Sequence, residues 1–440
     1  MNRFKYLLFF AALLLLIGAA HGQISYTSAV SAQRLNYYYS IYQGFEPKTM
    51  CIPDNPDYII TLAHEIGNTN TLLFLTQEGT NTVNVARISN YLITDFDIFH
   101  TNIVFCGETS TTSSPVQSIG VEDYMTLFSA NSQLNILEFP LANISGNLQK
   151  IRAYQDDGTM KIAAIMDSIY FLDIDWTNQT VDAFETQYKL NDIIVTETYV
   201  TALGTVSELK CMLFTHNKFD MQNYNGNMFR TKHRYQNTRY LIEEMPGYDL
   251  YENFSNGNQA IIGLVNEDLT DEFGIIDLNT LSVLSDFAVD SGLLRHSITD
   301  LCHDNDNQMI HCLSRDNIFK DYIYQPYPYT DTLTAVFPLD TVPLMKYQLK
   351  TITPHYNYFT TAGTCFGYGS NFNNSVYWFD AQIGNYSSSC LTTKPLTEKV
   401  SNFIYKIESV SYDNTFNISL SPNILQSQLI YDFYSYECQY

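Results

Sequence analysis

The chain is poor in basic residues. Its 440 residues include 23 Lys and Arg against 46 Asp and Glu, which gives a formal net charge of −23. A protein this acidic repels the phosphates of nucleic acid and the surface of anionic membranes. We therefore exclude nucleic acid as a partner, and we attribute the charge to solubility rather than to an acidic binding patch.

The short motifs of the common enzyme classes are also missing. There is no GxSxG elbow, no Walker A loop and no GxGxxG turn. The cysteines show no CxxC spacing, which disfavours zinc and thioredoxin-type chemistry. His64 has no second histidine at the metalloprotease spacing, and His303 and His311 are interpreted as residues flanking a polar hairpin. We expect neither a cofactor nor a metal, and we favour a binding protein over an enzyme.

No long hydrophobic run follows the N-terminus. Arg3 and Lys5 precede an apolar run over residues 7–17 that is too short to span a bilayer, and Ala20-His21-Gly22 offers small residues for cleavage before Gln23. Residues 1–22 are therefore predicted to be a secretory signal peptide. We expect residues 23–440 to be secreted to the periplasm, the cell surface or the medium, without membrane insertion.

An exported chain with an even number of cysteines is expected to form disulfides. The eight cysteines are Cys51, Cys106, Cys211, Cys302, Cys312, Cys365, Cys390 and Cys438. One pair is predicted from local structure: a hairpin whose turn spans residues 303–307 would bring Cys302 close to Cys312. The remaining connectivity stays open.

The most informative feature is a repeat of strand-like runs that end in an acid. Asp173, Asp277 and Asp380 each close such a run, and their numbering places them 104 and 103 residues apart. Similar runs lie near the midpoints, so the repeated unit is roughly 50 residues, the size of a propeller blade. Abundant Tyr, Phe and β-branched residues and hairpin turns such as Asn225-Gly226 predict an all-β chain.

We predict that residues 23–440 form one β-propeller, because neighbouring small sheets cover one another and ring closure protects their edges. Seven blades fit best, although six or eight remain open. Residues 402–440 are expected to form a closing blade or a small appendage. The alternative architecture is a pair of β-sandwich domains, which would not explain a repeat of about 50 residues.

The signal peptide, the strand end Phe105-Cys106-Gly107-Glu108 and the repeated strand pairs together resemble secreted, largely uncharacterised β-propeller proteins of Bacteroidetes. The resemblance covers most of the chain as a pattern. It implies a propeller fold and export, and it brings no catalytic residue with it.

Aromatic side chains are the candidate ligand contacts, because they offer large rigid surfaces at a small entropy cost. The densest group surrounds two prolines in a segment that reads as either a contact loop or a polyproline-like connection. Trp176 and Trp378 are the only tryptophans, and each is interpreted as either a sugar platform or core. The predicted ligand-binding residues are Tyr322, Tyr324, Tyr327, Tyr329 and Trp378.

Two functions are favoured over a third, which is a structural or adhesive component of the cell surface. The first is a secreted propeller that binds a protein or carbohydrate through its loops. The second is an extracellular polysaccharide hydrolase or lyase that uses paired carboxylates at the propeller funnel, which would leave no linear motif. Asp173, Asp277 and Asp380 are interpreted as turn fasteners rather than catalysts.

Overall fold

The prediction of an all-β chain is confirmed. The computed structural model describes residues 34–35, 48–64, 70–77, 83–109, 115–130, 132–140, 146–207, 210–231, 239–244, 258–265, 271–290, 296–304, 309–316, 321–327, 334–336, 345–355, 358–367, 375–382, 392–394, 397–400 and 404–430. These residues form strands β1 to β33 and one short helix, α2 (Tyr124–Leu127). The predicted signal peptide lies outside the described residues. Within them, no helix is long and apolar enough to cross a membrane.

The largest sheet has the strand order β2-β3-β4-β5-β33-β9-β8-β7-β6. Its strands are β2 (Lys48–Ile52), β3 (Asn55–His64), β4 (Thr71–Gln77), β5 (Val83–Ile88), β6 (Tyr91–Phe99), β7 (Asn102–Thr109), β8 (Val116–Asp123), β9 (Gln133–Glu138) and β33 (Ser421–Ile430). The edge strands β2 and β6 contact each other, so the sheet curls until it is nearly closed. One apolar cluster, which includes the buried side chains of Tyr91, Phe96 and Phe105, fills the curl.

Four further sheets each contain five antiparallel strands: β10-β11-β12-β13-β32, β14-β15-β16-β17-β31, β18-β19-β20-β21-β30 and β22-β23-β24-β25-β29. The first holds β10 (Leu148–Asp156), β11 (Thr159–Met166), β12 (Tyr170–Asp175), β13 (Thr180–Glu185) and β32 (Asn414–Ser419). The second holds β14 (Lys189–Val195), β15 (Tyr199–Ser207), β16 (Lys210–Asn217), β17 (Asp220–Thr231) and β31 (Ile404–Ser409).

The third of these sheets holds β18 (Arg239–Glu244), β19 (Gln259–Val265), β20 (Asp271–Asp277), β21 (Ser282–Asp290) and β30 (Thr397–Val400). The fourth holds β22 (His296–Asp304), β23 (Met309–Asp316), β24 (Asp321–Tyr327), β25 (Thr334–Val336) and β29 (Thr392–Lys394). The last sheet has the order β1-β28-β27-β26 and joins β1 (Arg34–Leu35), β26 (Met345–His355), β27 (Tyr358–Gly367) and β28 (Ser375–Gln382). It therefore pairs the N-terminal strand with a strand from late in the chain.

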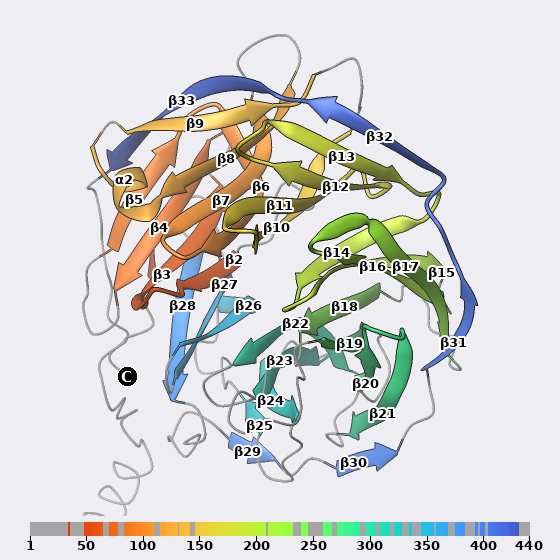
Figure 1. The fold of residues 1–440 in the computed structure, drawn as a ribbon. Coiled ribbons are helices and arrows are strands. Elements are labelled where there is room, and N and C mark those ends of the chain that lie inside the picture. The colour runs from red at the N-terminus through yellow and green to blue at the C-terminus, as the bar shows by residue number, and fades with distance from the viewer. Residues whose placement is uncertain are drawn as a thin grey trace, which may run out of the picture.

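The C-terminal strands run backward along the outside of the molecule. β29, β30, β31 and β32 pair in turn with β25, β21, β17 and β13, and β33 then pairs with both β9 and β5. Figure 1 shows these blue strands along the rim, far from the middle. We call the part that is described most completely, residues 404–430, the C-terminal belt. The belt extends three sheets and is not a separate unit, because each of its strands pairs with a strand from earlier in the chain.

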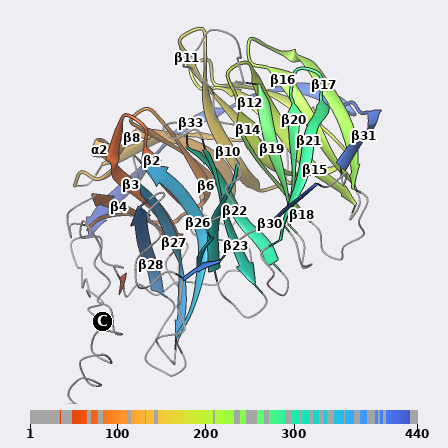
Figure 2. The same ribbon diagram turned by 90° about the horizontal axis from the view of Figure 1, so that it is seen from below.

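The strands that lie toward the middle of the molecule are β2, β6, β10, β14, β18, β22 and β26 (Figures 1 and 2). Each of these innermost strands contacts the next one in the order β2, β6, β10, β14, β18, β22 and β26. The circle closes because β26 contacts β2. Apolar cores fill the spaces between consecutive sheets, as in the cluster that joins β10–β13 to β14–β17. Central strands such as β4, with the sequence TLLFLTQ, are buried on both faces because a sheet packs on each side of them.

Candidate functional site

The innermost strands share a bulge that the sequence analysis missed. In β6 the pairing register shifts between Ile93 and Asp95. A register shift over the same spacing occurs in the innermost strands β10, β14, β22 and β26. A bulge adds one unpaired residue and turns the strand, so the next polar side chain is re-aimed. The residues that follow the shifts are Asp95, Lys150, Asp192, Asp300 and Thr351. The sequence signal is an aliphatic residue, a polar residue, a second polar or charged residue, and then another apolar residue.

These polar residues tie each innermost strand to the next one. Oδ2 of Asp95 accepts a hydrogen bond of 3.0 Å from the backbone N–H of Ile151, and Oδ2 of Asp97 accepts one of 2.7 Å from Ala153. Oδ2 of Asp300 likewise accepts a hydrogen bond of 2.9 Å from the backbone N–H of Ile352. The innermost strand of a sheet has no ladder partner on its inner side, so its N–H groups need such acceptors.

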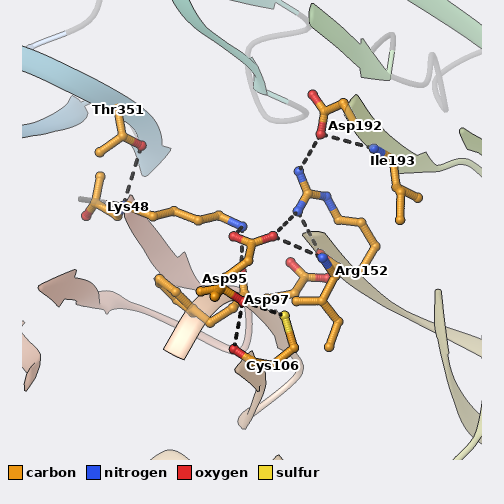
Figure 3. A network of polar contacts seen from close by, with 12 residues as sticks. Lys48, Asp95, Asp97, Cys106, Arg152, Asp192, Ile193 and Thr351 are labelled. Carbon is orange, nitrogen blue, oxygen red and sulfur yellow. Dashed lines mark hydrogen bonds and ion pairs between the residues drawn. The ribbon is translucent and has the colours of Figure 1, made fainter. Parts of the chain in front are cut away.

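Two cations converge on Asp95 (Figure 3). Nζ of Lys48 lies 2.9 Å from Oδ1 of Asp95, and Arg152 reaches Oδ2 at 3.6 Å while its other terminal nitrogen lies 3.7 Å from Asp192. Burial alone would raise the pKa of Asp95, but Lys48, Lys150 and Arg152 hold that pKa below its ordinary value. The Asp95 carboxylate is therefore ionised and fully engaged.

The polar residues around Asp300 are more acidic than those around Asp95. Oδ1 of Asp300 accepts from its neighbour Leu301 at 3.0 Å, so both of its oxygens are occupied. Burial raises the pKa of Asp300 to about 7, and the nearby Glu243 adds to the rise. Glu243 lies 2.7 Å from Nδ1 of His303. We call Lys48, Asp95, Asp97, Lys150, Arg152, Asp192, Glu243 and Asp300 the central charged cluster.

A groove on the outside of the molecule is the second candidate site. It is a cavity of about 460 Å³ whose walls are β8, β9, β33 and the turn after β12. Among the described residues that line it, none is titratable; the polar ones are Asn135, Gln179 and Asn423, and the aromatic one is Trp176. The groove therefore lacks the groups for acid–base chemistry and has those of a binding site. We call it the Trp176 groove.

Two of the three repeated acids, Asp173 and Asp277, differ in role, while Asp380 lies in β28 with its side-chain surroundings outside the described residues. Asp277 stabilises the turn after β20, because its Oδ1 accepts a hydrogen bond of 3.0 Å from the backbone N–H of Asn279. In β12 this role belongs to Asp175, which accepts 2.8 Å from the N–H of Asn178. Asp173 is instead buried and accepts from the hydroxyl of Tyr154, and burial raises its pKa to about 6. Interpreting Asp173 as a turn fastener was therefore wrong by two positions.

The predicted tyrosine site lies in a strand rather than in a connection. Tyr322, Tyr324 and Tyr327 belong to β24, which pairs with β23 on one side and β25 on the other. Trp378 lies in β28, opposite Ala362. Tyr329 and the side-chain surroundings of the other four are outside the described residues, so their ligand contacts stay a prediction. Trp176 is half-buried: it packs on an apolar core and also lines the groove.

The predicted bridge between Cys302 and Cys312 is corrected by the strand register. Cys302 is paired with His311, and Cys312 is paired with Leu301. Directly paired residues share a face of the sheet and neighbours in sequence alternate, so the two thiols point to opposite faces. The strand pairing is thus shifted by one residue from the predicted one, because Cys302 faces His311 and not Cys312. Cys106, Cys211 and Cys302 are free thiols, and burial raises the pKa of Cys106 and Cys211 to about 12.

The histidines considered as metal ligands do not converge with other ligands. His303 bonds Glu243, and Nε2 of His311 lies 3.6 Å from Asp304. Nε2 of His64 lies 2.6 Å from the carbonyl oxygen of Ile93. Within the part of the chain that the structure describes, no group of at least three His, Cys, Asp or Glu residues could hold a metal ion.

The chain matches no protein-family model and no curated protein. The two candidate sites are therefore what indicates the function of this protein.

Proposed function

We propose that this protein is a secreted, seven-bladed β-propeller that binds a protein or carbohydrate ligand and does not turn it over. The observation that carries the proposal is the use of the central carboxylates: Asp95, Asp97 and Asp300 accept backbone N–H groups of the next innermost strand. A carboxylate held in this way stabilises the scaffold and has little freedom to attack or protonate a substrate.

The count of seven blades is supported by grouping the strands in fours. Six groups are consecutive, from β2–β5 to β22–β25, and the seventh combines β26–β28 with β1. The nine-stranded sheet then consists of two blades that β33 joins at their outer edges. The circular order of contacts among the seven innermost strands supports the same interpretation. Pairing of β1 with β28 would close the ring with both ends of the chain.

The export part of the proposal rests on residues 1–22 and stays a prediction. Expression of the full chain with its own N-terminus in a bacterial host, followed by N-terminal sequencing of the exported product, should find Gln23 at the start. Retention of Met1 in the cell pellet would contradict it.

A retention and turnover assay tests the proposed function. The purified protein is immobilised and exposed to soluble polysaccharides and to a panel of extracellular proteins, and both bound material and released products are measured. We expect retention of a ligand without new reducing ends or unsaturated sugars. Product release that Asp300→Asn abolishes would overturn the proposal. Retention of no panel member would also count against it.

One observation favours the hydrolase or lyase as a second candidate. A carboxyl group with a pKa of about 7 is protonated in part at neutral pH, as a general acid must be, and Asp300 has this property next to Glu243. Against it, both oxygens of Asp300 already accept hydrogen bonds. The turnover measurement above separates the two functions.

A further inference from the structure

We propose that the Trp176 groove binds a neutral oligosaccharide. The indole of Trp176 would lie against the face of a sugar ring, and the amides of Asn135 and Gln179 would bond its hydroxyl groups. This inference rests on the proposed binding function and adds the site and the class of ligand.

The groove is held in shape by contacts outside the binding surface. Trp176 follows Asp175, which is fixed by Asn178 at 2.8 Å and by Nζ of Lys161 at 2.9 Å. The carbonyl oxygen of Gln179 accepts 2.9 Å from the N–H of Leu420, which ties the turn to the C-terminal belt. A surface fixed before binding loses little entropy when a ligand arrives.

The opposite wall is formed by β9 and β33, which are paired along the groove. Asn135 lies opposite Ile424, and Ile424 is 58% exposed. The amide nitrogen of Asn423 donates 2.7 Å to Glu138, so this amide is already used. Among the described residues, the side chains of Asn135 and Gln179 have no hydrogen-bond partner. They leave donors and acceptors for a ligand.

The side chains that line the groove favour a neutral ligand with many hydroxyl groups. An amide side chain offers both donors and an acceptor, which matches a hydroxyl group that is itself both. The lining carries no charge to pair with an ionic ligand, and the net charge of −23 repels anionic polymers. The cavity of about 460 Å³ lies within the range of small-molecule sites, about 300–1,000 Å³. The half-buried indole provides the flat apolar surface that such a site needs.

Calorimetric titration of the full-length exported protein with cello-, xylo-, manno-, malto- and chito-oligosaccharides tests the inference. We expect binding of at least one series, weakened at least about tenfold by Trp176→Ala and several-fold by Asn135→Ala. Because Trp176 also packs on the core, the exposed Asn135 provides a variant that leaves the core intact. Phe219→Ala is the matched control: this aromatic is 64% exposed in the turn before β17 and does not line the groove, so its removal should leave the affinity unchanged.

The outcomes separate this inference from the proposed function. Binding that Trp176→Ala and Asn135→Ala leave unchanged would overturn the groove as the site while the binding function stands. Binding of no neutral series, together with retention of a protein in the panel assay, would overturn the sugar class alone. Product release from a bound series would overturn the proposed function itself.

Discussion

The hydroxyl of Tyr412 lies 2.8 Å from Nε2 of His216, although the two residues are 196 positions apart in the chain. The carbonyl oxygen of Met221 can only accept, so Nδ1–H of His216 donates to it at 2.8 Å, and Nε2 accepts from Tyr412. Burial lowers the pKa of His216 to about 4, which keeps it neutral. The ring of Tyr412 stacks on Phe214 with centroids 4.0 Å apart. One buried tyrosine thus anchors the C-terminal belt between two sheets.

Removal of this anchor should destabilise the whole protein. We expect Tyr412→Ala to lower the free energy of unfolding by about 3–5 kcal/mol, as for other buried aromatic residues. Tyr412→Phe should cost about 1–3 kcal/mol, because it leaves Nε2 of His216 buried without a donor. Urea denaturation measures both. Tyr405→Ala, which removes a 41% exposed aromatic from the same belt, is the control and should change little. Equal effects of the two alanine variants would contradict the anchor.

Asp173→Asn should stabilise the protein at high pH and leave it unchanged at low pH. The pKa of Asp173 is about 6 in the folded protein against an ordinary value of 3.8. Between these values the folded chain holds a proton that the unfolded chain has released, so stability falls as pH rises from about 4 to about 6. Asparagine still accepts from Tyr154 but carries no charge.

Urea unfolding at pH 4 and pH 8 measures this effect as a difference between variant and wild type. We expect little difference at pH 4 and a gain of up to about 3 kcal/mol for Asp173→Asn at pH 8. The contributions of other titrating groups to the free energy of unfolding are the same in both proteins, so they cancel in this difference. A difference that is the same at both pH values would show that the Asp173 carboxyl does not have a raised pKa.

A double-mutant cycle on Lys48 and Asp95 tests the central charged cluster as a stabilising element. Asp95→Asn should cost about 3–5 kcal/mol, because it leaves the Lys48 ammonium without the carboxylate that pairs with it in a buried site. Lys48→Met should cost less, since Arg152 still faces Asp95 at 3.6 Å. We expect the double variant to cost at least about 1 kcal/mol less than the sum of the single variants. Additive effects would mean that the two side chains do not interact.

The corrected register predicts the state of one cysteine pair. Cys302 and Cys312 point to opposite faces of the sheet, so no disulfide should join them. Unfolding under acidic conditions, alkylation without a reductant and peptide mass spectrometry test this directly. A cross-linked peptide that contains both residues would contradict the register of β22 and β23.

The strand content was predictable, because the pattern of apolar residues in the sequence indicates strands. The runs ending at Asp175 and Asp277 each precede a turn that the acid fastens. The choice between Asp173 and Asp175 was not predictable, since both follow an apolar residue and only packing buries one of them. The disulfide prediction failed for a related reason: a shift of one residue in a hairpin moves a side chain to the other face.

The C-terminal belt and the two candidate sites were harder to anticipate. Belt strands such as β31, with the sequence IYKIES, are mostly exposed, and their partners are sheet edges that only the assembled fold brings together. The Trp176 groove likewise combines β9, β33 and the turn after β12. The central charged cluster did leave a signal, since polar residues follow a bulge in five innermost strands, from Asp95 to Thr351.

A crystal structure of the protein with the oligosaccharide that binds best in calorimetry would show directly where the ligand binds. We predict an intact sugar against Trp176, between β9, β33 and the turn at residues 176–179, with the central charged cluster unchanged. A sugar bound among Asp192, Glu243 and Asp300 at the centre, or cleaved there, would contradict it.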